Sequence, residues 1–178
     1  HSFPTRRSSD LAAALEHAEK IQVLVVDKTG TLTMGKPVVT NIIPIGKTDQ
    51  TTLLQIATLI EQNSEHPLAK AILDRAIGIN KLEQRITNFQ AITGRGVKAE
   101  IDGIAYILGS PKFLEEYGVE NNHIEIKKLQ LEGKTLVGVA IQHDHRYQSL
   151  GYFAIADQLR ETSKQAIQRI QAMGIEVI

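Results

Sequence analysis

The most constraining feature of this chain is an aliphatic run, Val23–Val26, that ends directly in the polar segment DKTGTLT at Asp27–Thr33. A short continuous run of this kind predicts a strand buried on both faces, as in a parallel sheet. Ligands of such sheets bind at the carboxyl ends of the strands, where we expect Asp27. A carboxylate in that place can attack phosphorus as a nucleophile and form an aspartyl-phosphate.

The residues that follow Asp27 suit a phosphate ligand. Lys28 would offset its negative charge, and Gly30 would let the backbone approach and offer N–H groups. Thr29 and Thr31 add hydroxyl donors. The Asp-Lys pair alone would be read as an ordinary polar turn after a strand, whereas the complete seven-residue segment is much more specific.

This segment resembles the phosphorylation motif of the P-type ATPases, the cation pumps of the haloacid dehalogenase-like superfamily. The resemblance implies Asp27 as nucleophile and Lys28 as charge partner, with Mg²⁺ held by the Asp27 carboxylate and the Thr29 backbone carbonyl. Phosphatases of the superfamily carry a second Asp two residues after the nucleophile, as general acid and base. Thr29 stands there instead, so a free-standing phosphatase is disfavoured and an aspartyl-phosphate should persist.

A second motif, Ser64–Leu68 (SEHPL), lies between two predicted helices. Because His66 precedes a proline, it is kept out of the helical region, and its ring can project from a helix start. The His-Pro pair alone would be an ordinary helix boundary with an exposed His. The full string resembles the adenine-site motif of the heavy-metal P-type ATPases, which implies that His66 and also Glu61, five residues earlier, belong to the nucleotide site.

Two glycine pairs complete the expected nucleotide site. In Gly94-Arg95-Gly96 the absence of side chains would let a nucleotide lie against the backbone, although a tight turn before a strand is the simpler alternative. This segment and Gly109-Ser110 match positions of the same family pattern, which usually has Asn where this chain has Ser110. The resemblance therefore implies Gly94, Gly96 and Gly109 as nucleotide-binding residues and leaves the role of the Ser110 side chain open.

Composition narrows the class of protein. The 178 residues include 20 basic and 20 acidic side chains, so nothing points to a nucleic-acid partner. There is no cysteine, which excludes disulfides and thiolate metal sites. No apolar run approaches the roughly 20 residues that span a bilayer. We therefore expect a soluble piece of a protein.

Periodicity and turn residues predict the secondary structure. A turn is expected at Gly35-Lys36-Pro37, where Pro37 would end any regular strand, and a two-residue hairpin turn at Asp102-Gly103. Helices are expected over 11–20, 50–63, 67–79, 111–117, 122–132 and 161–173, and strands over 23–26, 38–45, 86–91, 97–101, 104–108, 135–142, 147–155 and 175–178.

Together these features predict an α/β fold: a partial haloacid dehalogenase-like phosphorylation domain with a parallel sheet, and an inserted antiparallel α+β nucleotide-binding domain. The phosphorylation domain is expected over 11–36 and 149–178, and the nucleotide-binding domain over 37–148. Residues 1–10 lack periodicity and are interpreted as a non-native leader. The chain is expected to be truncated, without the transmembrane and actuator domains of the family or its later Mg²⁺-binding Asp.

The resemblance implies a parent pump at the cytoplasmic face of a membrane, driven by ATP and Mg²⁺, that moves a heavy-metal cation. SEHPL at Ser64–Leu68, together with Ile155–Asp157 and Arg160–Lys164, looks closest to copper-exporting members, so Cu⁺ is the expected cargo and Zn²⁺ or Cd²⁺ the alternative. Asp157 and Arg160 also resemble a stretch of the family's phosphorylation domain close to the catalytic site, with a helix-surface ion pair as the alternative for Arg160. We expect the fragment to show little turnover of its own. An ATP-binding module without catalysis is the second alternative.

Overall fold

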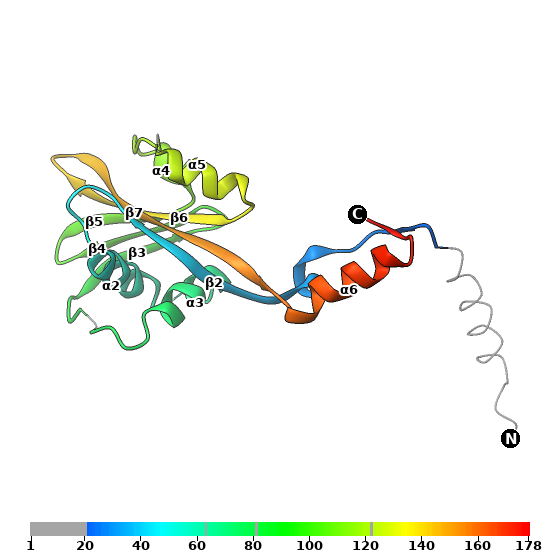
Figure 1. Cartoon of the computed structure of the whole chain (residues 1–178). Helices are drawn as coiled ribbons and strands as arrows, with labels where there is room; N and C mark the ends of the chain where they lie inside the picture. Colours follow the sequence, from blue (N-terminus) through cyan, green and yellow to red (C-terminus); the bar gives the residue numbers. More distant parts are fainter. Residues whose placement is uncertain (1–20, 63, 81, 122) are drawn as a thin grey trace, which may run out of the picture. The chain divides into compact units, whose positions relative to one another are not determined.

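The computed structural model describes residues 21–62, 64–80, 82–121 and 123–178, which form two compact units (Figure 1). The first unit combines the chain up to Gly35 with Leu159–Ile178, and the second comprises Lys36–Gln158. The predicted non-native leader over 1–10 and the predicted helix over 11–20 lie outside the described residues.

The first unit contains a short parallel sheet. Strand β1 (Val23–Leu24) pairs in parallel with β8 (Glu176–Val177), which follows helix α6 (Glu161–Ala172). The predicted parallel pairing is therefore confirmed, but the predicted complete burial is wrong. Val23 is 46% and Val25 76% exposed, because within the described residues β8 is the single strand that pairs with β1.

The second unit is built on a six-stranded sheet in the order β2-β7-β6-β5-β4-β3, in which neighbouring strands from β3 to β7 pair antiparallel. Four helices accompany it in the described residues. The strands are β2 (Thr33–Pro44), β3 (Ile86–Ile92), β4 (Gly96–Ile101), β5 (Ile104–Gly109), β6 (Thr135–His143) and β7 (Arg146–Leu159), and the helices are α2 (Gln50–Glu61), α3 (Pro67–Arg75), α4 (Pro111–Glu115) and α5 (Ile124–Leu131).

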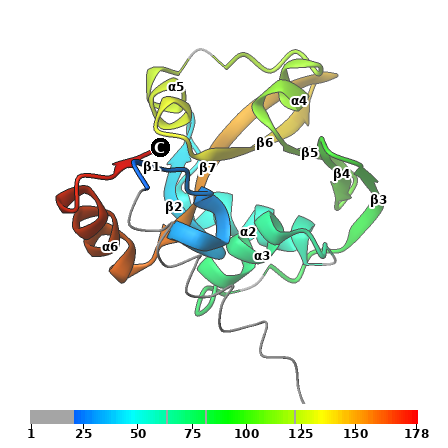
Figure 2. The same ribbon diagram turned by 90° about the vertical axis from the view of Figure 1, so that its right-hand side faces the viewer.

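Helices cover both faces of this sheet (Figures 1 and 2). Helices α2 and α3 pack on one face, where the core includes Leu108 and Phe153. Helices α4 and α5 pack on the other face, where the neighbouring strand residues Ile107 and Tyr152 belong to a second core. Alternate strand residues thus enter alternate cores, as the period of two of a β-strand requires.

Local sequence explains most element boundaries. Asp49 caps α2, because its carboxylate accepts a hydrogen bond from the Thr52 N–H at 3.0 Å. Asp102 and Gly103 have φ of 50° and 81°, as the predicted hairpin turn requires, and Ile101 pairs with Ile104.

The predicted interruption at Pro37 is wrong, because β2 runs without a break from Thr33 to Pro44. Strand β2 is the edge strand of the sheet, with β7 as its neighbour. An edge strand tolerates a residue without an N–H. The Lys36 N–H beside it donates to the Asp157 carboxylate in β7 at 2.8 Å.

The chain passes between the two units twice, through β2 and through β7. The expected boundary at 148/149 falls inside β7, and the second unit continues to Gln158. Strand β7 is longer than its predicted range: its pairing with β6 covers Arg146–Ile155, and the strand continues past that pairing to Leu159, with β2 as its other neighbour. The assignment of a phosphorylation and a nucleotide-binding role to the two units remains a prediction, taken up below.

Candidate functional site

Asp27 stands between β1 and an irregular turn, η1 (Lys28–Leu32). Its backbone is extended, with φ of −66° and ψ of 135°, and its side chain makes no capping hydrogen bond to that turn. The residue is exposed, as are Lys28 and Thr29. The predicted nucleophile is therefore accessible to a substrate from solvent.

The loop after Asp27 is held from inside by Thr33. This side chain is 2% exposed, and its Oγ1 accepts a hydrogen bond from the Gly30 N–H at 3.0 Å and lies 3.2 Å from the Lys28 carbonyl oxygen, to which it donates. Gly30 has a φ of 79°, a left-handed conformation that favours glycine. The Gly30 N–H, which the sequence suggested as a phosphate donor, is thus engaged within the loop.

Two residues at the start of α6 hold the same loop. The Arg160 side chain donates from Nε to the Thr33 carbonyl at 3.0 Å and from Nη2 to the Gly30 carbonyl at 2.9 Å. The Leu32 carbonyl accepts from the Arg160 backbone N–H at 2.9 Å and from the buried Ser163 Oγ at 2.8 Å. The described residues thus form a loop whose backbone carbonyls are fixed while its acidic first residue stays exposed.

The donors near Asp27 suit a hard cation. The Asp27 carboxylate and the Thr29 carbonyl are oxygen ligands of the kind that Mg²⁺ prefers, and Mg²⁺ commonly uses only one or two protein ligands beside water and phosphate oxygens. Within the described part of the chain no cluster of three or more His, Cys, Asp or Glu side chains could hold a metal ion. The donor set therefore fits Mg²⁺ that arrives with a phosphate substrate.

In the second unit, His66 and Glu61 of the expected nucleotide site lie close enough to interact. His66 is the N-cap of α3, and its Nδ1 accepts a hydrogen bond from the Leu68 N–H at 3.2 Å. Because Nδ1 is the acceptor, the neutral ring carries its proton on Nε2. The imidazole is exposed, so Nε2–H is a donor at the surface.

Glu61 is the last residue of α2 and is only 6% exposed. Burial raises the pKa of its carboxyl group, while a hydrogen bond with Ser64 and the charge of His66 act in the opposite direction. Its Oε2 has no hydrogen-bond partner within the described residues. Burying a carboxyl oxygen without a hydrogen-bond partner costs free energy of folding, and such an oxygen is suited to accept a hydrogen bond from a ligand.

The three predicted glycines lie at one end of the β4–β5 hairpin. Gly94 is in the turn before β4 with φ of 71°, and a Cβ on it would meet nothing within 4 Å. Gly96 and Gly109 are direct partners across β4 and β5. A Cβ on either would lie within 3 Å of the Phe113 ring and of the partner's backbone, so protein atoms fill the space that the sequence had suggested for a nucleotide.

A hollow of about 230 Å³ adjoins these glycines. It contains two basic side chains and one acidic side chain, and Arg95 pairs with Glu116 at 2.9 Å. The Ser110 hydroxyl accepts from the Phe113 N–H at 3.2 Å and caps α4, which supplies the side-chain role that the sequence left open. The lining residues are Gly94, Arg95, Ser110, Lys112, Phe113 and Glu116.

A larger hollow, of about 510 Å³, lies along α2, the end of α3 and the chain that follows. None of the predicted site residues lines it. The described helices include none that is long and apolar enough to cross a membrane.

The candidate site consists of the Asp27 loop in one unit and, in the other, the Glu61–His66 pair and the glycine hairpin.

Comparison with known proteins identifies the family. The family model of the haloacid dehalogenase-like hydrolases matches residues 21–178. The chain belongs to this family. It is 37% identical over 170 residues to a copper-exporting P-type ATPase of Bacillus subtilis, covering 92% of this chain and 20% of the relative. It is 38% identical over 169 residues to a probable cadmium-transporting ATPase of Staphylococcus aureus, covering 91% of this chain and 23% of the relative.

A solved structure extends this relationship to the fold. The crystal structure of a zinc-transporting PIB-type ATPase in its E2.Pi state matches with a TM-score of 0.72 at 30% identity, over 89% of this chain and 25% of that chain. The predicted resemblance to heavy-metal P-type ATPases and the predicted fold class are therefore confirmed. The chain spans about a fifth to a quarter of the length of these relatives.

Sequence reasoning missed the residues that hold the Asp27 loop. Thr33 closes the DKTGTLT segment and Ser163 lies in the Arg160–Lys164 segment, but the sequence pattern assigns neither residue a role of its own. Arg160 was noted for its resemblance to a stretch near the catalytic site, with a surface ion pair as the alternative. Its actual partners are backbone carbonyl oxygens, more than 120 residues away in sequence.

Proposed function

We propose that this chain carries the ATP-hydrolysing region of a heavy-metal pump and that Asp27 is its phosphorylated residue. The observation that carries the proposal is the exposed Asp27 carboxylate at the start of a loop whose backbone is fixed by Thr33, Arg160 and Ser163. Phosphoryl transfer needs positioning and charge neutralisation more than covalent chemistry, and a fixed loop supplies the first.

In this reading the second unit binds ATP. The Nε2–H of His66 and the unpartnered Oε2 of Glu61 would contact the adenine ring. Gly94 would offer backbone to the nucleotide, because the space around it is open, whereas Phe113 and the paired backbone fill the space at Gly96 and Gly109. Arg95 and Lys112 line the adjoining hollow and would attract phosphate charge.

In the first unit, an Asp27 carboxylate oxygen attacks the γ-phosphorus, and the bond between that phosphorus and the leaving oxygen of ADP breaks. Lys28 offsets the charge of the incoming phosphate. The Asp27 carboxylate and the Thr29 carbonyl would hold Mg²⁺, which neutralises phosphate charge when bound. Thr29 cannot act as a general base, so the aspartyl-phosphate persists long enough for a conformational change in the pump.

We assign Cu⁺ as the transported ion and place the parent pump in a membrane, with this chain on the cytoplasmic side. The segments Ser64–Leu68, Ile155–Asp157 and Arg160–Lys164 support copper, whereas the two relatives above are named for copper and for cadmium at nearly equal identity. Transport specificity resides in ligands within the membrane, where a cation must lose its water. Copper, zinc and cadmium are therefore compared directly in the test.

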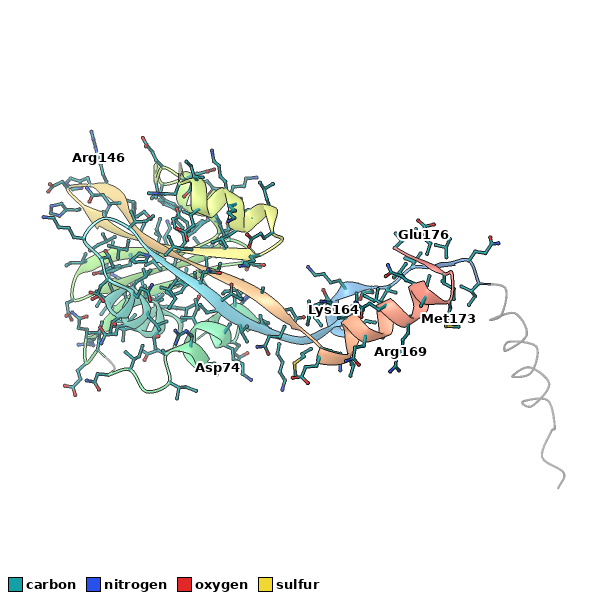
Figure 3. All side chains as sticks on the ribbon, viewed as in Figure 1. Asp74, Arg146, Lys164, Arg169, Met173 and Glu176 are labelled. Atoms are coloured by element: carbon teal, nitrogen blue, oxygen red, sulfur yellow. The ribbon has the colours of Figure 1, made fainter. Side chains whose placement is uncertain are left out.

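The test is phosphoenzyme formation by the full-length protein from γ-labelled ATP. Label is expected on Asp27, stable in acid and released by hydroxylamine as an acyl phosphate should be. Asp27→Asn should abolish it, while Asp74→Asn, an exposed carboxylate in α3 (Figure 3), should not. Label that survives Asp27→Asn would overturn the assignment. Phosphorylation that responds to Zn²⁺ or Cd²⁺ and not to Cu⁺ would overturn the choice of ion alone.

An ATP-binding module without catalysis is the second candidate for the isolated residues 1–178. It is favoured by the second unit, Lys36–Gln158, which is compact by itself and contains Glu61, His66 and the three glycines. Under this alternative, residues 1–178 bind ATP and do not turn it over. Sustained hydrolysis by residues 1–178 that is lost in Asp27→Asn would rule it out.

A further inference from the structure

Arg160 joins the Asp27 loop to the start of α6 at three points. It directly follows Leu159, the last residue of β7. Its backbone N–H and two of its guanidinium N–H groups donate to three carbonyl oxygens of the loop, those of Leu32, Thr33 and Gly30, at 2.9 to 3.0 Å. All three bonds are made to backbone, so they act on the shape of the loop.

The guanidinium group suits this task. Its donors form a rigid planar fork, so Nε and Nη2 can reach the carbonyls of Thr33 and Gly30 at the same time. A lysine ammonium is a single point of charge on a flexible stem and does not reproduce that spacing. One of these carbonyls belongs to Gly30, whose backbone is left-handed, and the other belongs to Thr33, the residue directly after the turn η1.

A helix-surface ion pair, the alternative suggested by the sequence, does not describe these contacts. The partners of the guanidinium are carbonyl oxygens, and the Thr33 side chain between them is buried. The bond to Thr33 is partly buried and the bond to Gly30 is exposed, and the charged donor makes each stronger than a hydrogen bond between neutral groups. The same loop begins with Asp27, and the carbonyls that Arg160 and Ser163 hold lie three to six residues after it.

We propose that Arg160 is a positioning residue for phosphoryl transfer, which holds residues 28–33 in the shape that presents the Asp27 carboxylate and the Thr29 carbonyl. The inference rests on the proposed function of Asp27. Because the proposed nucleotide contacts belong to the other unit, the loss of Arg160 slows phosphorylation at saturating ATP and leaves ATP affinity unchanged. A misplacement of about 1 Å costs on the order of 100-fold in rate, so an effect of at least 10-fold is expected.

The experiment compares variants of the full-length protein in phosphoenzyme formation and in ATP binding. Arg160→Gln removes the charge and the fork, and Arg160→Lys keeps the charge alone. The matched control is Arg169→Gln, because Arg169 lies on the same helix and its side chain extends away from the ribbon in Figure 3. Amide hydrogen exchange at Gly30 and Thr33 reports the loop itself, independently of activity.

We expect Arg160→Gln to phosphorylate at least 10-fold more slowly with unchanged ATP affinity and faster exchange at Gly30. Arg160→Lys should be intermediate and Arg169→Gln normal. Equal rates for Arg160→Gln and Arg169→Gln, or a loss confined to ATP affinity, would overturn the inference. If Arg160→Gln does not fold, the Arg160→Lys variant tests the inference, because a normal phosphorylation rate in that variant would show that the guanidinium fork is not needed. Label that persists in Asp27→Asn refutes the proposed function instead.

Discussion

Gly96 and Gly109 face each other across β4 and β5, and the Phe113 ring occupies the side of the pair where their side chains would stand. A Cβ on Gly96 would lie 2.2 Å from the Leu108 carbonyl oxygen, and one on Gly109 2.4 Å from the Arg95 carbonyl oxygen. These atoms are backbone and cannot move aside cheaply. The pattern of glycines in this hairpin is therefore required by packing, whatever the nucleotide contacts.

This packing predicts that Gly96→Ala and Gly109→Ala each destabilise the second unit by about 1–3 kcal/mol, the usual cost of overpacking a well-filled place. Gly94→Ala is the contrasting variant, because a Cβ there meets nothing and only the left-handed φ of 71° is strained. Its cost should be about 1 kcal/mol. Chemical denaturation of the three variants checks the order, and a Gly96→Ala protein as stable as wild type would contradict it.

His66 offers a way to separate helix capping from nucleotide binding. His66→Ala removes both the ring and the Nδ1 acceptor that caps α3, so it should cost about 1 kcal/mol of stability and also weaken ATP binding. His66→Asn keeps a capping side chain and should preserve stability while still weakening ATP binding. Calorimetric titration with ATP, together with thermal unfolding, measures the two effects.

One outcome for the His66 variants would refute the adenine contact. If His66→Asn binds ATP as tightly as wild type while His66→Ala does not, the cap alone matters and the proposed adenine contact is wrong. Asp27→Asn provides the control, since it lies in the other unit and should barely change ATP affinity.

Much of this arrangement could be predicted from the sequence, where local chemistry decides it. Asp49 caps the expected helix α2, and Asp102-Gly103 forms the expected turn. The continuation of β2 through Pro37 could not be predicted, since it depends on that strand lying at the edge of the sheet. The contact of Arg160 with Gly30 spans 130 residues, and no local pattern encodes it.

Buried Glu61 should make stability depend on pH. Burial raises the pKa of its carboxyl group in the folded state, so its contribution to stability is fully present below the unfolded pKa of about 4.3 and is lost as pH rises through the raised pKa. Glu61→Gln cannot ionise and should gain stability relative to wild type over that interval. Melting temperatures without nucleotide, measured from pH 4 upward, check this.

Glu65→Gln is the matched control for Glu61, because Glu65 is a nearby carboxylate that is exposed. Its melting temperature should follow that of wild type at every pH. If Glu61→Gln also follows wild type throughout, the Glu61 carboxyl group is not desolvated in solution. The same variant should bind ATP more weakly if Oε2 accepts a hydrogen bond from adenine, since an amide group presents one acceptor in place of two.

Thr33 provides the last prediction, because its hydroxyl bonds to both the Gly30 N–H and the Lys28 carbonyl. Thr33→Val keeps the volume of the buried side chain and removes both bonds, so it should cost about 1–3 kcal/mol and slow phosphorylation of Asp27. Thr33→Ser keeps the hydroxyl and should retain most of the rate, although it leaves a small cavity. Rapid-quench phosphorylation from labelled ATP ranks the variants. A Thr33→Val rate above that of Thr33→Ser would show that packing of the methyl group, and not the two hydrogen bonds, fixes the loop.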